Sequence, residues 1–344
     1  MVQLSQVALT ACMAWDVQAR LCKMENLITF GDSYTDESRA YYFRDNGHAP
    51  PVGYLPPRDE KAFGGGYTWS RVVADLTGAR FYNYAVAGAM CADNITTHWF
   101  EPINDNFPSV LDYEIPAYKA DVPLPDYFTD RRADNTVYAL WIGTNDLGID
   151  GFLSDSNVRG TSLTTFVDCV WQTFDKIYET GGRNFVLLNI VPLEHSPAYA
   201  PPERGGVGDH QFWEDKSKYN MTEYAYKMFE YSTSVNTLFD IGAEYHLLLK
   251  KRWPGATFTV FDVHSLFLDI RADPSKYLDQ PANTTYPWHR CVTGDDCTTA
   301  ELPLSNYQWY DELHPSARID EIIAKEFVNV VKGTSKYATI HRYH

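Results

Sequence analysis

The sequence lacks the short motifs of the commonest metal and cofactor sites. It contains no Cys-x-x-Cys pair, no His-Glu-x-x-His, no Walker A loop and no convincing Gly-x-Gly-x-x-Gly turn. It also lacks Gly-x-Ser-x-Gly, the nucleophile elbow of α/β-hydrolases. We therefore expect the protein to work without a metal ion or an organic cofactor.

Basic residues are scarce as well, since 29 Lys and Arg face 45 Asp and Glu and the formal net charge is −16. A surface of this charge repels nucleic-acid phosphates and anionic membranes. No apolar run reaches the roughly 18 residues that a transmembrane helix needs, and the C-terminal residues Thr339–His344 are too polar for a lipid-anchor signal. We expect no nucleic-acid or membrane partner, and nothing in the sequence indicates a protein partner.

The N-terminus lacks the basic residues that normally begin a signal peptide, because no Lys or Arg precedes Arg20. The apolar run Val7–Trp15 is nevertheless long enough for a signal-peptide core, and Val17–Ala19 suits a cleavage site. Residues 1–25 are therefore either a cleaved signal peptide or an N-terminal extension. Three Asn-x-Thr sequons favour secretion and permit N-glycosylation; they begin at Asn94, Asn220 and Asn283.

Six cysteines are too few for a disulfide scaffold in a chain of 344 residues. Cys291 and Cys297 enclose a polar, turn-forming loop, so a local disulfide between them is expected in an oxidising compartment. Cys169 lies in an expected helix, where we interpret it as a buried small hydrophobic residue.

Short apolar runs alternate with longer helical segments along the chain, and no repeat or linker divides them. This alternation is typical of βαβ units. We predict one domain over residues 26–344, built as a three-layer α/β/α sandwich with a central parallel, flavodoxin-like sheet. The expected strands cover 27–30, 81–86, 137–142, 185–191 and 257–263, and the expected helices cover 68–76, 163–179, 219–251 and 317–331.

Polar or small residues that could carry chemistry follow three of these strands, at the sheet edge where open α/β folds bind ligands. Ser33, after Gly31 and Asp32, is a nucleophile or the N-cap of a helix. Gly88 offers an unobstructed N–H to an oxyanion, or only permits close packing. Asn145 offers its side-chain amide to an oxyanion, or forms an Asx turn.

An acid and a base that suit a nucleophilic serine lie near the other end of the chain. Asp311 and His314 are three residues apart before the last helix, and can converge on one point. Alternatively they belong to a solvated loop in which Ser316 caps that helix. Two rival pairs remain, Asp262 with His264 on one face of an extended segment, and the weaker Glu194 with His195.

The motifs together resemble those of the GDSL or SGNH hydrolase family. Its four blocks correspond in order and spacing to Gly31–Ser33, Gly88, Gly143–Asp146 and Asp311–His314. The similarity extends from Ile28 to Tyr337 for fungal carbohydrate esterase family 16, a group of acetylesterases.

The resemblance implies a role for each matching residue. Ser33 would be the nucleophile, and Asp311 and His314 would be its acid and base. The backbone N–H of Ser33, Gly88 and Asn145 would form the oxyanion hole. Tyr34 stands where the eponymous motif has leucine, which leaves this chemistry unchanged.

The resemblance further implies a secreted serine esterase that releases acetyl groups from small carbohydrate acetates, in particular short xylo-oligosaccharides. The alternatives are a lipase or longer-chain carboxylesterase of the same fold and a non-catalytic carbohydrate-binding protein, which the intact Ser33, Asp311 and His314 disfavour. Loop aromatics such as Trp99, Phe100 and Trp288 could stack on sugars or simply pack.

Overall fold

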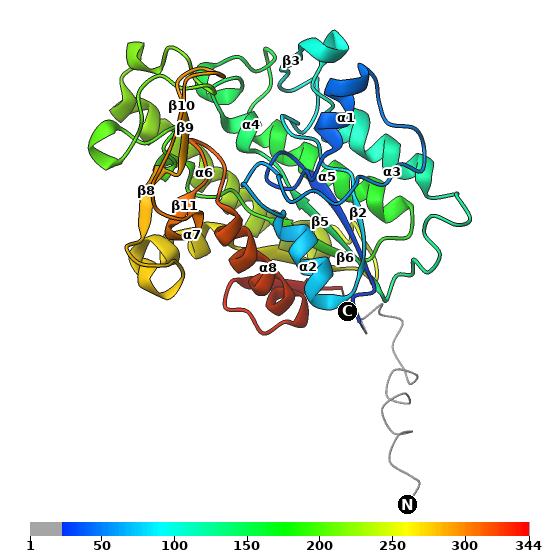
Figure 1. Ribbon diagram of the computed structural model, residues 1–344. Helices are drawn as coiled ribbons and strands as arrows, with labels where there is room; N and C mark the ends of the chain where they lie inside the picture. Colours follow the sequence, from blue (N-terminus) through cyan, green and yellow to red (C-terminus); the bar gives the residue numbers. More distant parts are fainter. Residues whose placement is uncertain (1–22, 344) are drawn as a thin grey trace, which may run out of the picture.

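The computed structural model describes residues 23–343, which form a six-stranded sheet between two layers of helices (Figure 1). The strand order is β12-β7-β6-β5-β1-β2. The bounds of these strands are β1 (Asn26–Gly31), β2 (Arg80–Asn83), β5 (Thr136–Trp141), β6 (Asn184–Leu188), β7 (Thr257–Phe261) and β12 (Ala338–Arg342). Neighbouring strands are parallel except for β12, which runs antiparallel to β7 at one edge.

Helices α2 (Trp69–Thr77) and α8 (Ala317–Lys332) lie side by side on one face of the sheet (Figure 1). The other face is covered by α3 (Ile115–Asp121), α5 (Leu163–Glu179) and α6 (Met221–Glu244). Short elements at the carboxyl ends of the strands include α1 (Arg39–Asn46), α4 (Thr144–Leu147) and the pair β3 (Trp99–Phe100) and β4 (Asp105–Asn106). The remaining α-helix and strands of the described residues are α7 (Val263–Ala272), β8 (Asn283–Pro287), β9 (His289–Cys291), β10 (Cys297–Thr299) and β11 (Tyr307–Trp309).

Helix α5 shows how the sequence produces this layering. Its apolar residues recur at helical spacing, and Ser162 and Thr165 cap its first turn reciprocally. Phe174 points from this helix onto the sheet, where its ring centroid lies 4.8 Å from that of Phe258 in β7. Trp253 stacks on the same ring at 5.3 Å, so aromatic packing joins helix and sheet.

The expected α/β sandwich is confirmed, with one correction to its parallel sheet. Strand β12 was not expected, because its sequence Ala-Thr-Ile-His-Arg is too polar to be recognised as a strand. An edge strand is partly exposed, so it needs no continuous apolar run. The signal-peptide interpretation concerns residues 1–25, of which 1–22 lie outside the described residues.

The segment after β7 also differs from the expectation. Residues 257–263 were expected to be extended, but the strand ends at Phe261 and α7 begins at Val263. Asp262 is the N-cap of this helix and accepts a hydrogen bond from the Ser265 N–H. His264 therefore lies on the first turn of a helix and does not share a strand face with Asp262.

Two disulfides cross-link the described part of the chain. Cys291–Cys297 is the expected local bridge, and it joins the paired strands β9 and β10. Cys169 is buried as expected, but it is bonded to Cys91 and is not a free thiol. This bridge fastens α5 to the loop after β2, over 78 positions of sequence that no local pattern connects.

The two disulfides should contribute unequally to stability, because a bridge that closes a longer loop restricts the unfolded chain more. Replacing Cys91 and Cys169 by alanine should lower the free energy of unfolding by about 4 kcal/mol, against about 2 kcal/mol for Cys291 and Cys297. Denaturant unfolding of both double variants measures this difference. Equal losses would show that loop length does not determine these contributions.

Candidate active site

Ser33 lies in a tight turn directly after β1, at the carboxyl edge of the sheet. The turn begins at Gly31, whose φ of +142° and contact with the Trp141 carbonyl leave no space for a Cβ. The Asp32 carbonyl then accepts hydrogen bonds from Thr35 and Asp36, each at 2.9 Å. Since α1 is preceded by Ser38 as its N-cap, Ser33 does not cap a helix.

The structure brings Ser33, His314 and Asp311 together into one hydrogen-bonded chain. His314 Nε2 lies 2.8 Å from Ser33 Oγ, and its Nδ1 lies 2.8 Å from Asp311 Oδ2. Asp311 also accepts the backbone N–H groups of Leu313 and His314, at 2.8 and 2.7 Å. The distances suit transfer of the serine proton to the imidazole.

Burial distinguishes this cluster from a solvated loop. Ser33, Asp311 and His314 are 7%, 6% and 4% exposed. Burial alone would lower the pKa of His314, but the nearby carboxyl groups, Asp311 above all and then Asp32 and Glu312, together raise it above the ordinary 6.5. Ser316 does cap α8, through a hydrogen bond from the Ile319 N–H, alongside the cluster.

Gly88 and Asn145 lie where oxyanion donors are expected, after β2 and β5. Gly88 has a φ of +86°, and a Cβ there would lie 2.5 Å from the Phe107 ring. Within residues 23–343, no protein acceptor bonds the backbone N–H of Ser33 or Gly88. Asn145 Nδ2 donates one hydrogen to the Ala89 carbonyl at 2.9 Å, which leaves its second hydrogen for another acceptor.

Two buried carboxyl groups hold the loops that carry these donors. Asp146 accepts hydrogen bonds from Cys91 N–H at 3.0 Å and Thr96 Oγ1 at 2.8 Å, which joins the loops after β2 and β5. Burial raises its pKa to about 6. Asp32 accepts the Tyr34 N–H at 3.0 Å, and burial raises its pKa to about 7. Both residues belong to the motif blocks recognised in the sequence, but only their burial and hydrogen bonds reveal this supporting role.

The rival pairs do not form a comparable chain. Asp262 accepts hydrogen bonds from Asn189 and Ser265, while His264 Nδ1 lies 3.0 Å from the Ile190 carbonyl. His195 Nε2 lies 3.8 Å from Glu194, and burial lowers the pKa of this histidine to about 4. None of the four lines the cleft around Ser33.

That cleft has a volume of about 670 Å³ and opens over Ser33 and His314. Aromatic rings make much of its wall, including Phe63, Phe107 and Phe212. Besides Asp311, the charged side chains in its lining are Arg44, Asp150, Glu214 and Asp215. A cleft of this size accommodates a small organic molecule with both apolar and polar faces.

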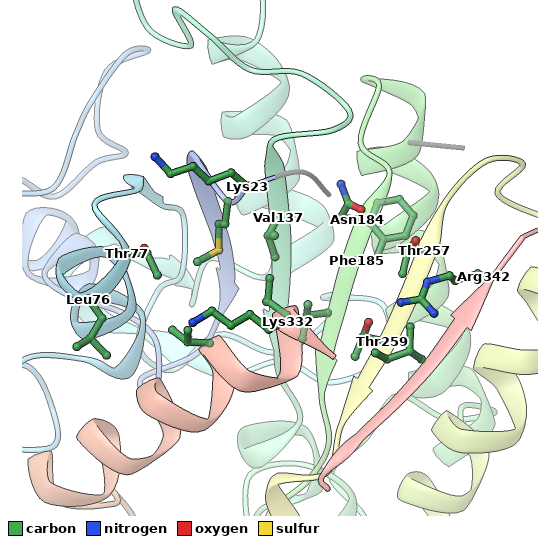
Figure 2. A pocket seen from close by; sticks show the side chains of 15 residues that line it. Lys23, Leu76, Thr77, Val137, Asn184, Phe185, Thr257, Thr259, Lys332 and Arg342 are labelled. Carbon is green, nitrogen blue, oxygen red and sulfur yellow. The ribbon is translucent and has the colours of Figure 1, made fainter. Parts of the chain in front are cut away.

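A second pocket of about 690 Å³ lies at the opposite, amino ends of the strands (Figure 2). Its lining includes Val137, Asn184 and Thr257 from the first residues of β5, β6 and β7. Lys23, Lys332 and Arg342 supply positive charge there. No histidine or carboxylate lines it among the described residues, so it offers no acid–base pair.

Of the loop aromatics considered from the sequence, Phe100 lines the cleft around Ser33, whereas Trp99 and Trp288 do not. The rings nearest to His314 in that cleft, Phe63 and Phe212, were not singled out from the sequence. Neither belongs to a recognisable motif, and only the fold places them beside the histidine.

Comparisons with known proteins identify the family and several relatives of this chain. The family model described as GDSL-like lipase/acylhydrolase matches residues 27–327. An acetylesterase from Hypocrea jecorina is 50% identical over 315 residues, which cover 91% of this chain and 90% of the relative. An acetylesterase from Thermothelomyces thermophilus is 22% identical, with 94% of each chain covered. The crystal structure of a catalytic mutant of an acetylxylan esterase from Geobacillus stearothermophilus has a TM-score of 0.39 and 14% identity, covering 90% of this chain and 94% of that one.

Replacement of the serine should abolish turnover without unfolding the protein. Ser33→Ala removes the hydroxyl that is hydrogen-bonded to His314 Nε2, so hydrolysis of an acetate ester should fall at least about 10³-fold. A serine-directed phosphonate, followed by peptide mass spectrometry, should label Ser33 alone. His264→Ala serves as the control and should stay active. If His264→Ala were inactive while Ser33→Ala remained active, the assignment of the nucleophile and of the base would be wrong.

The pH dependence of kcat/KM should report the raised pKa of His314. The imidazole must be neutral to accept the serine proton, so activity should fall with decreasing pH through a midpoint above 6.5. Asp311→Asn removes the charge that raises this pKa, so the midpoint should move to lower pH while kcat falls about 10⁴-fold. Profiles from about pH 4 to pH 9 test both statements. If the midpoint does not move in Asp311→Asn, Asp311 does not raise the pKa of the group that controls activity.

Proposed function

Because the chain belongs to the GDSL-like lipase/acylhydrolase family, we propose that it hydrolyses acetyl esters of small carbohydrates through an acyl-enzyme on Ser33. The family and the 50% identical relative make it an ester hydrolase of the acetylesterase type. The observation that carries the assignment of its residues is the hydrogen-bonded chain from Ser33 through His314 to Asp311.

The reaction proceeds in two halves at this cluster. His314 Nε2 takes the proton of Ser33 Oγ as the oxygen attacks the ester carbonyl, and Asp311 stabilises the imidazolium. The negative oxygen of the tetrahedral intermediate accepts hydrogen bonds from the N–H groups of Ser33 and Gly88 and from Asn145 Nδ2. His314 then donates the proton to the leaving alcohol, and a water molecule hydrolyses the acyl-enzyme by the same steps in reverse order.

Carbohydrate acetates suit the cleft better than long lipids do. Both full-length relatives are named acetylesterases, and the lining combines aromatic rings with charged side chains. Rings pack on the apolar faces of sugars, while charged groups bond their hydroxyls. We take short acetylated xylo-oligosaccharides as the specific substrate.

We also place the protein outside the cell, as a glycoprotein. Both disulfides of the described residues form and persist in an oxidising compartment. Asn94 and Asn220, the first residues of two sequons, are exposed and accessible to glycosylation. No described helix is long and apolar enough to cross a bilayer.

Activity should decrease as the acyl chain of the substrate lengthens. Additional methylenes in a closely packed acetyl site cost roughly 1–3 kcal/mol, which corresponds to about a tenfold to hundredfold loss of kcat/KM. Acetate esters should therefore be hydrolysed faster than butyrate and octanoate esters of the same alcohol, and acetylated xylo-oligosaccharides should release acetate. Faster hydrolysis of octanoate, with no acetate released from the oligosaccharides, would make the protein a lipase or long-chain esterase.

A further inference from the structure

The proposed deacetylation determines on which side of the site the sugar lies, and the inference here rests on that proposed function. When the tetrahedral intermediate collapses, His314 Nε2 donates its proton to the leaving oxygen. That oxygen must then lie within hydrogen-bond distance of Nε2. The sugar bonded to it lies beside the imidazole, while the oxyanion points toward Gly88 and Asn145.

Two aromatic rings of the cleft lie next to His314. The ring centroid of Phe63 is 5.5 Å from that of His314, and Phe212 is 5.4 Å away. Both side chains are partly exposed and line the cleft. The ring centroid of Tyr34 lies 5.9 Å from that of the same imidazole. Tyr34 is only 3% exposed and its hydroxyl donates to the Leu313 carbonyl, so its ring is part of the buried core and does not face the cleft.

The turn that carries Phe212 is held in place before any substrate binds. His210 and Trp213 exchange backbone hydrogen bonds of 3.2 and 2.8 Å across it. The Gln211 N–H donates to the Cys291 carbonyl at 3.0 Å, and Gln211 Nε2 donates to Glu312 at 3.1 Å. A ring fixed in this way loses little entropy when a ligand packs on it.

Two other rings that line the cleft lie on its oxyanion side. Phe100 and Phe107 stack on one another at 4.1 Å, and Phe107 lies against Gly88 on the oxyanion side. Carboxyl groups reach the lining on both sides of the cleft, since Glu214 and Asp215 follow Phe212 and Asp150 lies near His98. Apolar rings beside acceptor groups match a sugar, which presents C–H faces and hydroxyl donors together.

We propose that Phe63 and Phe212 form the subsite for the sugar ring of the leaving group. They are specificity residues, because they bind the part of the substrate that carries no reacting atom. His314, which both rings contact, transfers the proton to the leaving oxygen.

The test compares two acetate esters that differ only in the alcohol, a monoacetylated methyl xyloside and methyl acetate. The quantity measured is the ratio of their kcat/KM values, because a general disturbance of His314 affects both esters and cancels. Phe63→Ala and Phe212→Ala should each lower this ratio roughly tenfold, through loss of the ring face that packs on the sugar. Phe212→Tyr retains the ring and should retain the ratio.

Phe100→Ala is the matched control, since it removes an identical ring from the same cleft on the side away from His314. Its ratio should stay within about twofold of the wild-type ratio. Circular dichroism checks folding, and Phe→Leu variants replace any alanine variant that does not fold.

The outcomes are distinguishable. A wild-type enzyme that hydrolyses neither ester overturns the proposed function and the subsite with it. A wild-type enzyme that hydrolyses both, with an unchanged ratio in the Phe63 and Phe212 variants, overturns the subsite alone. A ratio that falls in Phe100→Ala and not in those variants would place the sugar on the oxyanion side.

Discussion

The parallel pairing of β1 with both of its neighbours is the constraint on which the site depends. Strand β1 lies between β2 and β5, so the three loops that follow these strands emerge at one edge of the sheet. Gly31 is paired with Trp141, and its carbonyl accepts the Val86 N–H at 3.0 Å. Ser33, Gly88 and Asn145 follow these paired positions within a few residues, so the backbone of the sheet alone brings the proposed nucleophile and oxyanion donors together.

Buried carboxyl groups below this edge make the arrangement rigid at an electrostatic cost. Asp146 joins the loops after β2 and β5, and Glu114 accepts the Gly31 N–H at 2.9 Å. Burial raises the pKa of both acids, which means that the surrounding structure disfavours their charged forms. Their cost is offset by the hydrogen bonds that they accept from backbone N–H groups, Gly31 for Glu114 and Cys91 for Asp146.

The sequence is sufficient to predict whatever depends on local pattern. Helix α5 was expected over the residues it occupies because its apolar period and its caps are local signals. Helix α7 was not predicted at all, because Asp262, which follows a β-branched and aromatic run, acts as a helix cap only when the chain turns there. The partner of Cys169 could not be identified from sequence, since 78 positions separate it from Cys91. Strand β12 likewise forms by pairing with the edge of β7, a long-range contact that its own sequence does not indicate.

His314, the proposed base, lies 281 positions from Ser33 in the sequence, so its placement requires a different explanation from that of Gly88 and Asn145. Glu312, between Asp311 and His314, accepts hydrogen bonds from the Cys291 N–H at 2.7 Å and from Gln211 Nε2 at 3.1 Å. The loop of the base is thereby joined to the disulfide-bridged pair β9 and β10 and to the turn beside Phe212. One buried carboxyl group thus links the loop that carries His314 to the wall of the cleft beside Phe212. The fold therefore connects the proposed general acid to the proposed sugar subsite.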